Sequence, residues 1–548
     1  MDSLNVAKMY ARFVTSMPGY LRRRLTVEDA REAIRRGLAE RETNFLRIAR
    51  RCIYDNPRSA YLPLLRHAGC ELGDLESSVR DKGLEPTLDE LRAAGVYFTF
   101  EEYKGRAPVR RGSLELEIDS RQFDNPLTAR AFEGQTTGST GAGTRVETDV
   151  DNLFSQVPHL MMVRVVNGIY GAPTAVWYGA PPDPTGLGIY LRTTPYRNTP
   201  RRWFTPWMPG MPKPALKYRM ALWYVLAVSR LCGVPCARPE PTSFEDAVVV
   251  ARWAADAVRE HGMAQVICTV SLAVRVSVAA VEAGIDLSGV AFFGGGEPFT
   301  AAKKAAVERS GARYISFYIS EDVGPIALTC AHPIEEGDNH LVEDGLAVIQ
   351  HPREVPGTDI VVEPFHFTSL RPHSSKVLLN VQSDDYGIIE ERSCGCGFEE
   401  LGYHRHVRRI RSFGKLTGEG VTLVGSEMIK VLEEVLPQRF EATPLDFQLL
   451  EEEDENGLSR LSLLVHPRVQ VADEQDVIDT VFGALEESST AAGLAGGMWQ
   501  QAKALRVRRQ EPIWTATGKL IPIRVAGLHG PAPADGRVVA APTGQATP

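Results

Sequence analysis

The chain has 548 residues, of which 43% are hydrophobic, and its formal net charge is -8. That length supports more than one domain with a large core, and the acidic balance argues against the basic stripe of a nucleic-acid-binding protein. The first residues lack the long apolar region of a signal peptide, and the most apolar stretch, residues 220–228, is too short to cross a bilayer. We therefore expect a soluble, cytoplasmic protein with no nucleic-acid or membrane partner.

The first 92 residues have the periodicity of helices. In "TVEDAREAIRRGLAERETNFLRIARRCIY" the apolar residues recur at helical spacing. Thr26 and Asp29 have the spacing of a capping pair at the start of a helix. We expect a mainly helical entry to the fold.

A loop rich in glycine and hydroxyl groups follows in "GQTTGSTGAGTRVETD", residues 134–149. Glycines let backbone N–H groups crowd around an anion, and Ser and Thr add donors, which is typical of phosphate binding. Gly138 and Gly143 have the spacing of the P-loop, but Thr144 stands where its lysine is needed. The residues alone leave two interpretations open: a phosphate site of another kind and an ordinary surface loop.

Strand-like and helix-like segments alternate in the middle of the chain. "AQVICTVS" (residues 264–271) has the pattern of a buried strand, and "AVRVSVAAVEAG" that of the next helix. "GVAFFGGGEPF" is a strand that enters a glycine turn, "TAAKKAAVERSG" a helix, and "ARYISFYISE" the next strand. This alternation predicts an α/β sheet that binds ligands at the carboxyl ends of its strands.

The pattern changes after about residue 415. "SEMIKVLEEVLP" and "EQDVIDTVFGALEES" have helical periodicity, and "FQLLEEEDENGLSRLSLLVHP" indicates two strands joined by an acidic turn. We expect a large domain over residues 1–415, a small α+β domain over residues 416–526, and a disordered tail rich in Gly, Pro and Ala over residues 527–548.

Six segments, in this order, resemble the acyl-adenylate-forming superfamily, and in particular its phenylacetate–CoA ligase branch. They are residues 136–145, "FFGGGEP", "FYISE", "SDDYG", "IRSFGKLTGEG" and "TATGKLIPIR". The resemblance extends from about Tyr61 to Arg524. It implies an α/β fold in which a large N-terminal domain of mixed sheets and helices is joined to a small, mobile α+β domain by a hinge near residues 415–418.

The resemblance also implies an ATP site. The residues that match nucleotide-contacting positions of the family are Thr137, Gly138, Ser139, Thr140, Gly141, Thr144, Gly295, Gly296, Glu297, Pro298, Phe317, Tyr318, Ser320, Asp385 and Lys415.

Three of the implied roles concern catalysis. Thr140 would hold the β- and γ-phosphates, Glu321 would bind Mg²⁺, a cation that prefers carboxylate oxygen, and Lys519 would bridge the carboxylate and the α-phosphate. Asp385 would accept hydrogen bonds from the ribose hydroxyls, with Asp384 as the alternative.

Cysteine and histidine pairs suggest a second site. "TCAHP" contains Cys330 and His332, and "SCGCGF" contains Cys394 and Cys396. Three thiols and an imidazole suit tetrahedral zinc and leave no open position for catalysis, and the resemblance supports a structural Zn²⁺ here. Unligated thiols are the alternative. The pair in "GYHRHVRR", His404 and His406, is expected on the surface.

Three positions depart from the family pattern. Gly143 replaces the proline of the phosphate loop, and the pair Phe317-Tyr318 replaces Tyr-Gly. Lys415 replaces an arginine, and a lysine can make a point-charge contact but not a bidentate one. The segment 176–241 is rich in Trp, Tyr, Met and Pro and is a candidate wall for an aromatic acid, although such clusters are also typical of cores.

We expect an ATP- and Mg²⁺-dependent enzyme that activates a carboxylic acid, aromatic by preference, as acyl-AMP with release of pyrophosphate, and then transfers the acyl group to CoA or another acceptor. Two enzymatic alternatives remain: activation of nitrite for diazotization of an aryl amine in a biosynthetic pathway, and direct adenylylation of a hydroxyl. A non-catalytic nucleotide-binding homologue is the alternative of another class. The oligomeric state is left open, with a homodimer as one option.

Overall fold

The structure is a computed structural model, and it divides the chain into two compact units. The first contains Met1–Thr136, Thr144–Arg353 and Val362–Ser412, and the second Thr137–Gly143, Glu354–Val361 and Phe413–Pro548. The residues that the structure describes are 3–129, 132–135, 145–181, 183–206, 215–296, 299, 301–320, 322–354, 361–412, 415–418, 421–424, 428, 430–442, 446–453, 459–488, 496, 499–500, 503–513 and 522–524.

Helices form the first part of the chain, as the periodicity predicts. They are α1 (Ser3–Arg22), α2 (Val27–Ala39), α3 (Arg41–Ile48), the π-helical turn η1 (Ala49–Tyr54), α4 (Tyr61–His67), α5 (Leu72–Lys82) and α6 (Leu84–Ala93). The predicted capping pair is confirmed: Thr26 Oγ1 accepts from the Asp29 amide at 3.1 Å, and Asp29 Oδ2 accepts from the Thr26 amide at 2.9 Å.

A sheet of twelve strands organises the first unit. One half is parallel and contains, in spatial order, β7 (Pro239–Thr242), β6 (Arg202–Pro206), β5 (Thr174–Trp177), β8 (Ala264–Ile267), β9 (Val290–Gly294) and β10 (Arg313–Ser320). The other half is antiparallel and continues with β11 (Gly324–Thr329), β12 (Asn339–Leu341), β18 (Arg405–Ser412), β17 (Val381–Glu391), β16 (Pro364–Ser369) and β13 (Leu346–Gln350). The mixed α/β fold expected from the alternating segments is confirmed.

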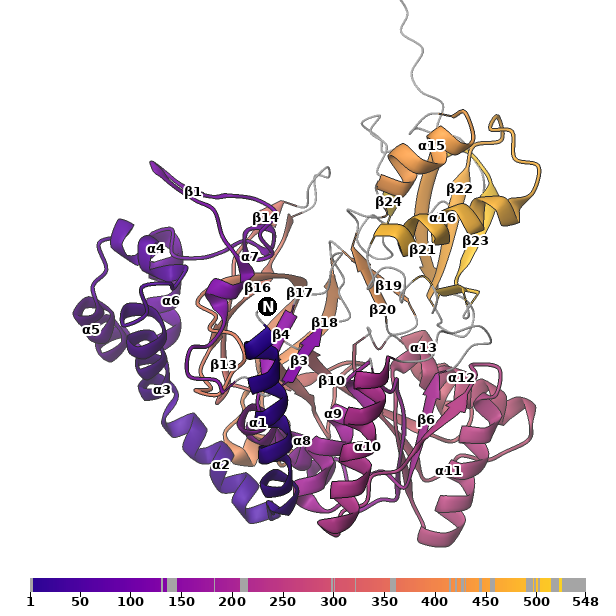
Figure 1. Cartoon of the computed structure of the whole chain (residues 1–548), viewed down its shortest axis with the longest axis horizontal. Coiled ribbons are helices and arrows are strands. Elements are labelled where there is room, and N and C mark those ends of the chain that lie inside the picture. Colours follow the sequence, from indigo (N-terminus) through magenta and orange to yellow (C-terminus); the bar gives the residue numbers. More distant parts are fainter. Residues whose placement is uncertain are drawn as a thin grey trace, which may run out of the picture. The chain divides into compact units, whose positions relative to one another are not determined.

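Helices pack against this sheet (Figure 1), and two clusters of buried apolar side chains lie between them and the strands. Helix α8 (Val150–Val166) and α2 supply one core, in which Met161 and Val163 pack with strand residues such as Ile267, Phe293 and Leu328. The N-terminal helices α3 to α6 supply the other core, against the antiparallel strands β13, β16 and β17. Helices α11 (Ala247–His261), α12 (Val270–Glu282) and α13 (Ala301–Glu308) connect the parallel strands.

One boundary differs from the sequence-based expectation. The strand predicted over residues 264–271 ends at Ile267, and α12 begins at Val270. Thr269 is the helix cap, since its side chain accepts from the Leu272 amide. The apolar residues after the cap therefore belong to the helix.

The second unit has a four-stranded sheet. Its strands, in spatial order, are β23 (Leu505–Arg509), β22 (Ser459–Val465), β21 (Phe447–Glu453) and β24 (Ile523–Arg524). The predicted antiparallel pair is confirmed as β21 with β22, and the helix of "EQDVIDTVFGALEES" as α16 (Glu474–Ser488). The segment "SEMIKVLEEVLP" contains a π-helical turn, η5 (Val431–Val435), followed by the short α15 (Leu436–Arg439).

Among the described residues, no helix combines the length and the apolar character needed to cross a membrane.

Candidate functional site

The carboxyl ends of β8, β9 and β10 meet in a turn where there is no room for a side chain. A Cβ atom at Gly294 would lie 2.0 Å from the Cys268 carbonyl oxygen, and one at Gly295 would lie 2.1 Å from the Phe317 carbonyl oxygen. Gly296 has a φ of +91°, which glycine adopts without strain. The glycines thus let the backbone of this turn approach the neighbouring strands closely.

Phe317 is held in place beside this turn. Its ring stacks on Phe293 with a centroid distance of 4.8 Å, and the guanidinium of Arg164 lies 4.1 Å from the Phe293 centroid on β9. Arg164 is 2% exposed. The stack fixes the end of β10, from which the predicted ATP-site residues Phe317, Tyr318 and Ser320 come.

Tyr318 points to the other side of β10 and connects it to β17. Its hydroxyl donates to Asp385 Oδ2 at 2.5 Å, and its ring is near Phe365. Burial, and then the charge of Asp385, raise the pKa of Tyr318 well above its ordinary value, so the hydroxyl stays protonated and remains a donor. Sequence reasoning placed both residues in the ATP site but did not predict that they contact each other.

Asp384 and Asp385 differ in their surroundings, because successive residues of a strand point to opposite faces. Asp384 is 2% exposed, whereas Asp385 is only partly buried. The Ser383 hydroxyl accepts from the Asp385 amide at 3.1 Å and donates to its carbonyl. Asp385 is therefore the more exposed of the two residues.

Other predicted residues have less structural context. Lys415 is the first residue of β19 (Lys415–Gly418) in the second unit. Ten predicted residues lie outside the described residues: Thr137, Gly138, Ser139, Thr140, Gly141, Thr144, Glu297, Pro298, Glu321 and Lys519.

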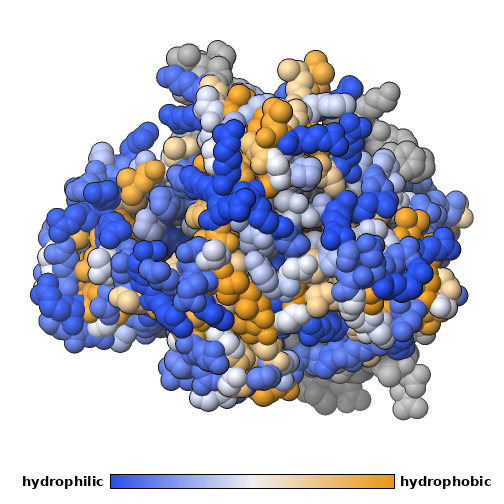
Figure 2. All heavy atoms as spheres, turned by 90° about the horizontal axis from the view of Figure 1, so that it is seen from below, coloured by the Kyte–Doolittle hydropathy of each residue, from blue (hydrophilic) through white to orange (hydrophobic). Residues whose placement is uncertain are grey.

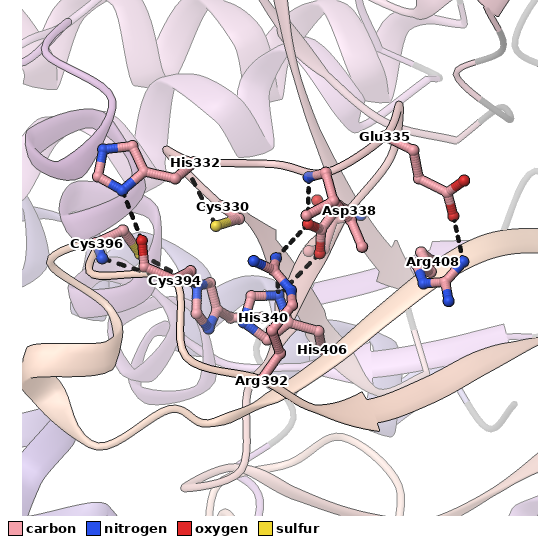
Figure 3. A network of polar contacts seen from close by, with 12 residues as sticks. Cys330, His332, Glu335, Asp338, His340, Arg392, Cys394, Cys396, His406 and Arg408 are labelled. Carbon is pink, nitrogen blue, oxygen red and sulfur yellow. Dashed lines mark hydrogen bonds and ion pairs between the residues drawn. The ribbon is translucent and has the colours of Figure 1, made fainter.

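A buried cluster of cysteine and histidine side chains lies in the antiparallel half of the sheet (Figure 3). Cys330 follows β11, His340 is in β12, Cys394 follows β17, and His406 is in β18. One ligand atom from each of these four residues lies within 4.8 Å of all the others. The fifth member, Cys396, has its Sγ 3.1 Å from His340 Nε2.

The surroundings of the two histidines orient their Nε2 atoms towards the cluster. His340 Nδ1 is 3.1 Å from the Tyr403 carbonyl oxygen, which can only accept, so this nitrogen carries the proton. His406 Nδ1 is 2.8 Å from Asp338 Oδ1. His406 Nε2 is buried and has no hydrogen-bond partner among the described residues, and a carboxylate behind a histidine is a common support for a metal ligand.

The sulfur atoms of the three cysteines also have hydrogen-bond donors around them. Each of the three accepts a backbone amide: from His332 to Cys330, from Cys396 to Cys394, and from Phe398 to Cys396. The hydrogen bond from the Cys330 thiol, and then the contact with His340, lower the pKa of Cys396. The same hydrogen bond, and then burial, raise the pKa of Cys330. Buried thiolates and neutral imidazoles are the donors that zinc prefers.

Two expectations for this cluster need correction. His332 is exposed, its Nδ1 contacts the Cys394 carbonyl oxygen at 2.8 Å, and it is not one of the four clustered residues. His406, expected on the surface, is fully buried, while His404 is exposed. The reason is the register of the sheet: His340 pairs directly with His406, and their rings are 4.0 Å apart.

Comparisons with known proteins give matches only among solved structures; no family model and no curated protein matches the chain. A 2-hydroxyisobutyryl-CoA ligase bound to 2-HIB-AMP and CoA is 14% identical, with 92% of each chain covered and a TM-score of 0.48. The amide bond synthetase McbA from Marinactinospora thermotolerans is 11% identical, with 90% of this chain and 97% of that chain covered and a TM-score of 0.39. The anthranilate CoA ligase AuaEII, in complex with anthranoyl-AMP, is 13% identical, with 80% and 75% covered and a TM-score of 0.34. At these identities the likeness concerns the fold alone, and TM-scores below 0.5 carry no argument about chemistry.

Proposed function

We propose that this protein is an ATP-dependent, AMP-forming ligase that activates a carboxylic acid. The observation that carries the proposal is the arrangement around the carboxyl end of β10. There the turn at Gly295, which has no room for a side chain, lies against the Phe317 carbonyl oxygen, and the next residue, Tyr318, holds the carboxylate of Asp385 on β17. Ligands of α/β sheets bind at the carboxyl ends of the strands.

Each part of this arrangement suits one part of ATP. The glycine turn suits the flat adenine, because backbone atoms can lie directly against it. Asp385 suits the ribose, because its carboxylate is only partly buried and the Tyr318 hydroxyl holds it in place. Tyr318 and Ser383 together fix the carboxylate before the nucleotide arrives, which reduces the entropy lost on binding.

In the proposed reaction a carboxylate oxygen of the substrate attacks the α-phosphorus of ATP, and the bond to pyrophosphate breaks. Lys519 and the loop around Thr140 would neutralise the negative charge of the phosphates, and Glu321 would hold the Mg²⁺ that also serves this purpose. The acyl carbon of the mixed anhydride is then attacked by the acceptor, a CoA thiol or an amine, and AMP leaves. An aromatic acid is the proposed substrate class.

The proposal is tested by measuring pyrophosphate and AMP with a panel of aryl and fatty acids, each alone, with CoA and with nitrite. The full chain should release pyrophosphate only when a suitable acid is present, and AMP should accumulate when the acceptor is added. Asp385→Asn should raise the KM for ATP, whereas Asp384→Asn should affect stability instead. AMP that appears only with nitrite and an amino-bearing ring would replace this proposal by diazotization, and nucleotide binding without turnover over the whole panel would indicate a non-catalytic homologue.

We also propose that the cluster holds a structural zinc ion through Cys330, His340, Cys394 and His406. The four donors are close enough for one tetrahedral ion, and an ion would satisfy the buried His406 Nε2. Such an ion would join β11, β12 and β18 and the loop after β17.

Metal analysis of the purified full chain should give one zinc per chain. His340→Ala and His406→Ala should each lose most of it and lower the unfolding temperature. His332→Ala and His404→Ala, matched controls from the same segments, should retain the metal. Zinc loss in the His332 variant together with retention in the His340 variant would refute this ligand set and restore the one expected from the sequence.

A further inference from the structure

Helix α10 (Leu216–Leu231) exposes a stripe of large apolar side chains. Figure 2 shows apolar patches among polar residues on one face of the protein, which is ordinary for a surface. The stripe on α10 is different, because it runs along the length of one helix. Its members are exposed at 66% for Leu216, 62% for Met220, 60% for Trp223 and 84% for Leu231.

The stripe lies on the side of α10 that faces away from the core. With about 100° of rotation per residue, its four side chains fall within an arc of roughly 80°, and Val225 and Ser229 fall on the opposite side. Both of those residues are fully buried. The helix therefore has one apolar side that packs inside the unit and a second apolar side that faces solvent.

Every charged residue of α10 is basic. On α10, Lys217 lies on one flank of the stripe, and Arg219 and Arg230 lie on the other. The sequence contains no Asp or Glu from residue 184 to residue 239, although the chain as a whole has a net charge of -8.

The neighbouring helix α1 has the same character. It contacts α10 through the Tyr224 hydroxyl, which donates to the Val14 carbonyl oxygen at 2.5 Å, and through the rings of Phe13 and Tyr224. Its exposed residues include Tyr10 and Val14, and residues 3–27 contain basic residues but no acidic ones. The two helices thus form one apolar and basic surface, the α1/α10 face.

The positive charge of the α1/α10 face favours an anionic lipid surface over a second copy of the chain as its partner. A second copy of the chain, packed face to face, would bring the arginines and lysines of both copies together, which is unfavourable. An anionic lipid surface instead complements the basic flanks and accepts the apolar stripe. Tryptophan and tyrosine, here Trp223 with Arg238 over its ring, are typical of the membrane interface.

We propose that the α1/α10 face docks on an anionic lipid surface, with α10 lying in the plane of the interface. The helix has the features of an interfacial helix: an apolar side, basic flanks and no acidic residue. The binding is peripheral and reversible, and it is independent of the proposed enzymatic function.

The test is sedimentation of the full chain with phosphatidylcholine vesicles, with and without phosphatidylglycerol, at low and high salt. We expect binding only to the anionic vesicles and weaker binding at high salt. Arg219→Glu with Arg230→Glu should weaken partitioning at least ~30-fold, since each basic residue near the surface contributes roughly fivefold and charge reversal adds repulsion. Met220→Ser with Trp223→Ser and Leu231→Ser should abolish it.

The matched controls are Val281→Ser and Ile334→Ser, which remove exposed apolar side chains outside the face and should not change vesicle binding. Equal binding to neutral and anionic vesicles, or no binding at all, overturns the proposal. A dimer that dissociates when Trp223 is replaced by Ser would identify the face as a subunit interface instead. Salt-sensitive retention on an acidic polypeptide resin without vesicle binding would identify an acidic protein as the partner.

Discussion

The contact between Tyr318 and Asp385 predicts a specific effect on nucleotide affinity. Tyr318→Phe removes the hydroxyl that donates to Asp385 Oδ2 at 2.5 Å and keeps the ring in its place near Phe365. A hydrogen bond to a charged group contributes about 1.5–3 kcal/mol. The variant lacks this donor, so the carboxylate is held less firmly before the nucleotide binds.

We expect the KM for ATP to rise roughly tenfold, which corresponds to the lower end of that range, because Ser383 still positions the backbone of Asp385. The kcat should change little, since the ribose contact is made equally in the ground and transition states. The effect should be the same across the accessible pH range, because the raised pKa of Tyr318 keeps the hydroxyl protonated throughout.

The assay is acid-dependent pyrophosphate release at varied ATP concentrations, with unfolding curves recorded for each variant. Tyr386→Phe is the matched control, since it removes the hydroxyl of the next residue on β17. An unchanged KM for ATP in a folded Tyr318→Phe variant would refute the role of this pair in binding ribose. A fall in kcat at unchanged KM would instead indicate that Tyr318 acts on the reacting groups.

Other predictions concern the turn and the buried charges. Gly295→Ala should weaken ATP binding and destabilise the first unit by about 1–3 kcal/mol, because its Cβ would lie 2.1 Å from a carbonyl oxygen of β10. Nucleotide titration would measure the first effect and urea unfolding the second. Asp344→Asn should cost about 3–5 kcal/mol in urea unfolding, because it leaves the buried Arg371 without its counter-charge. Burial raises the pKa of Asp344, but the charge of His159 and other partners outweigh burial and hold this pKa below its ordinary value. Since the folded-state pKa is the lower one, the stabilisation by Asp344 is present above its unfolded-state pKa of about 3.9 and is lost as the pH falls below it; the Asn variant should show a flatter loss of stability in acid.

Local sequence patterns predicted the elements of the fold well. Helical periodicity and the Thr26–Asp29 cap identified the N-terminal helices, and the alternation of apolar strands with amphipathic helices identified β8, β9 and β10. These signals work because they depend on residues close in sequence. The one displaced boundary, at Ile267, arose because Thr269 was interpreted as part of a strand and not as a helix cap.

Contacts between distant strands could not be predicted in the same way. Phe317 was identified at the end of its strand, but the bond between Tyr318 and Asp385 depends on β10 and β17 being brought together by the fold. His340 was missed for the same reason, because only the pairing of β12 with β18 places it opposite His406. Alternation gave no usable signal for His406, because the adjacent residues His406 and Val407 are both buried, so that both faces of β18 are covered at this point.

The two proposed sites of the first unit are connected through the same antiparallel strands. His340 on β12 pairs with His406 on β18, and β18 in turn pairs with β17, where Asp385 is opposite Ser412. The Tyr403 carbonyl orients His340, and the Tyr403 hydroxyl donates to the buried Asp344. An ion bound at His340 and His406 would therefore fix the register of β12 against β18, and with it the strand that pairs with the carboxylate-bearing β17. The proposed metal site and the proposed nucleotide site would then depend on the same strands. The ion would maintain the register on which the contact between Tyr318 and Asp385 depends.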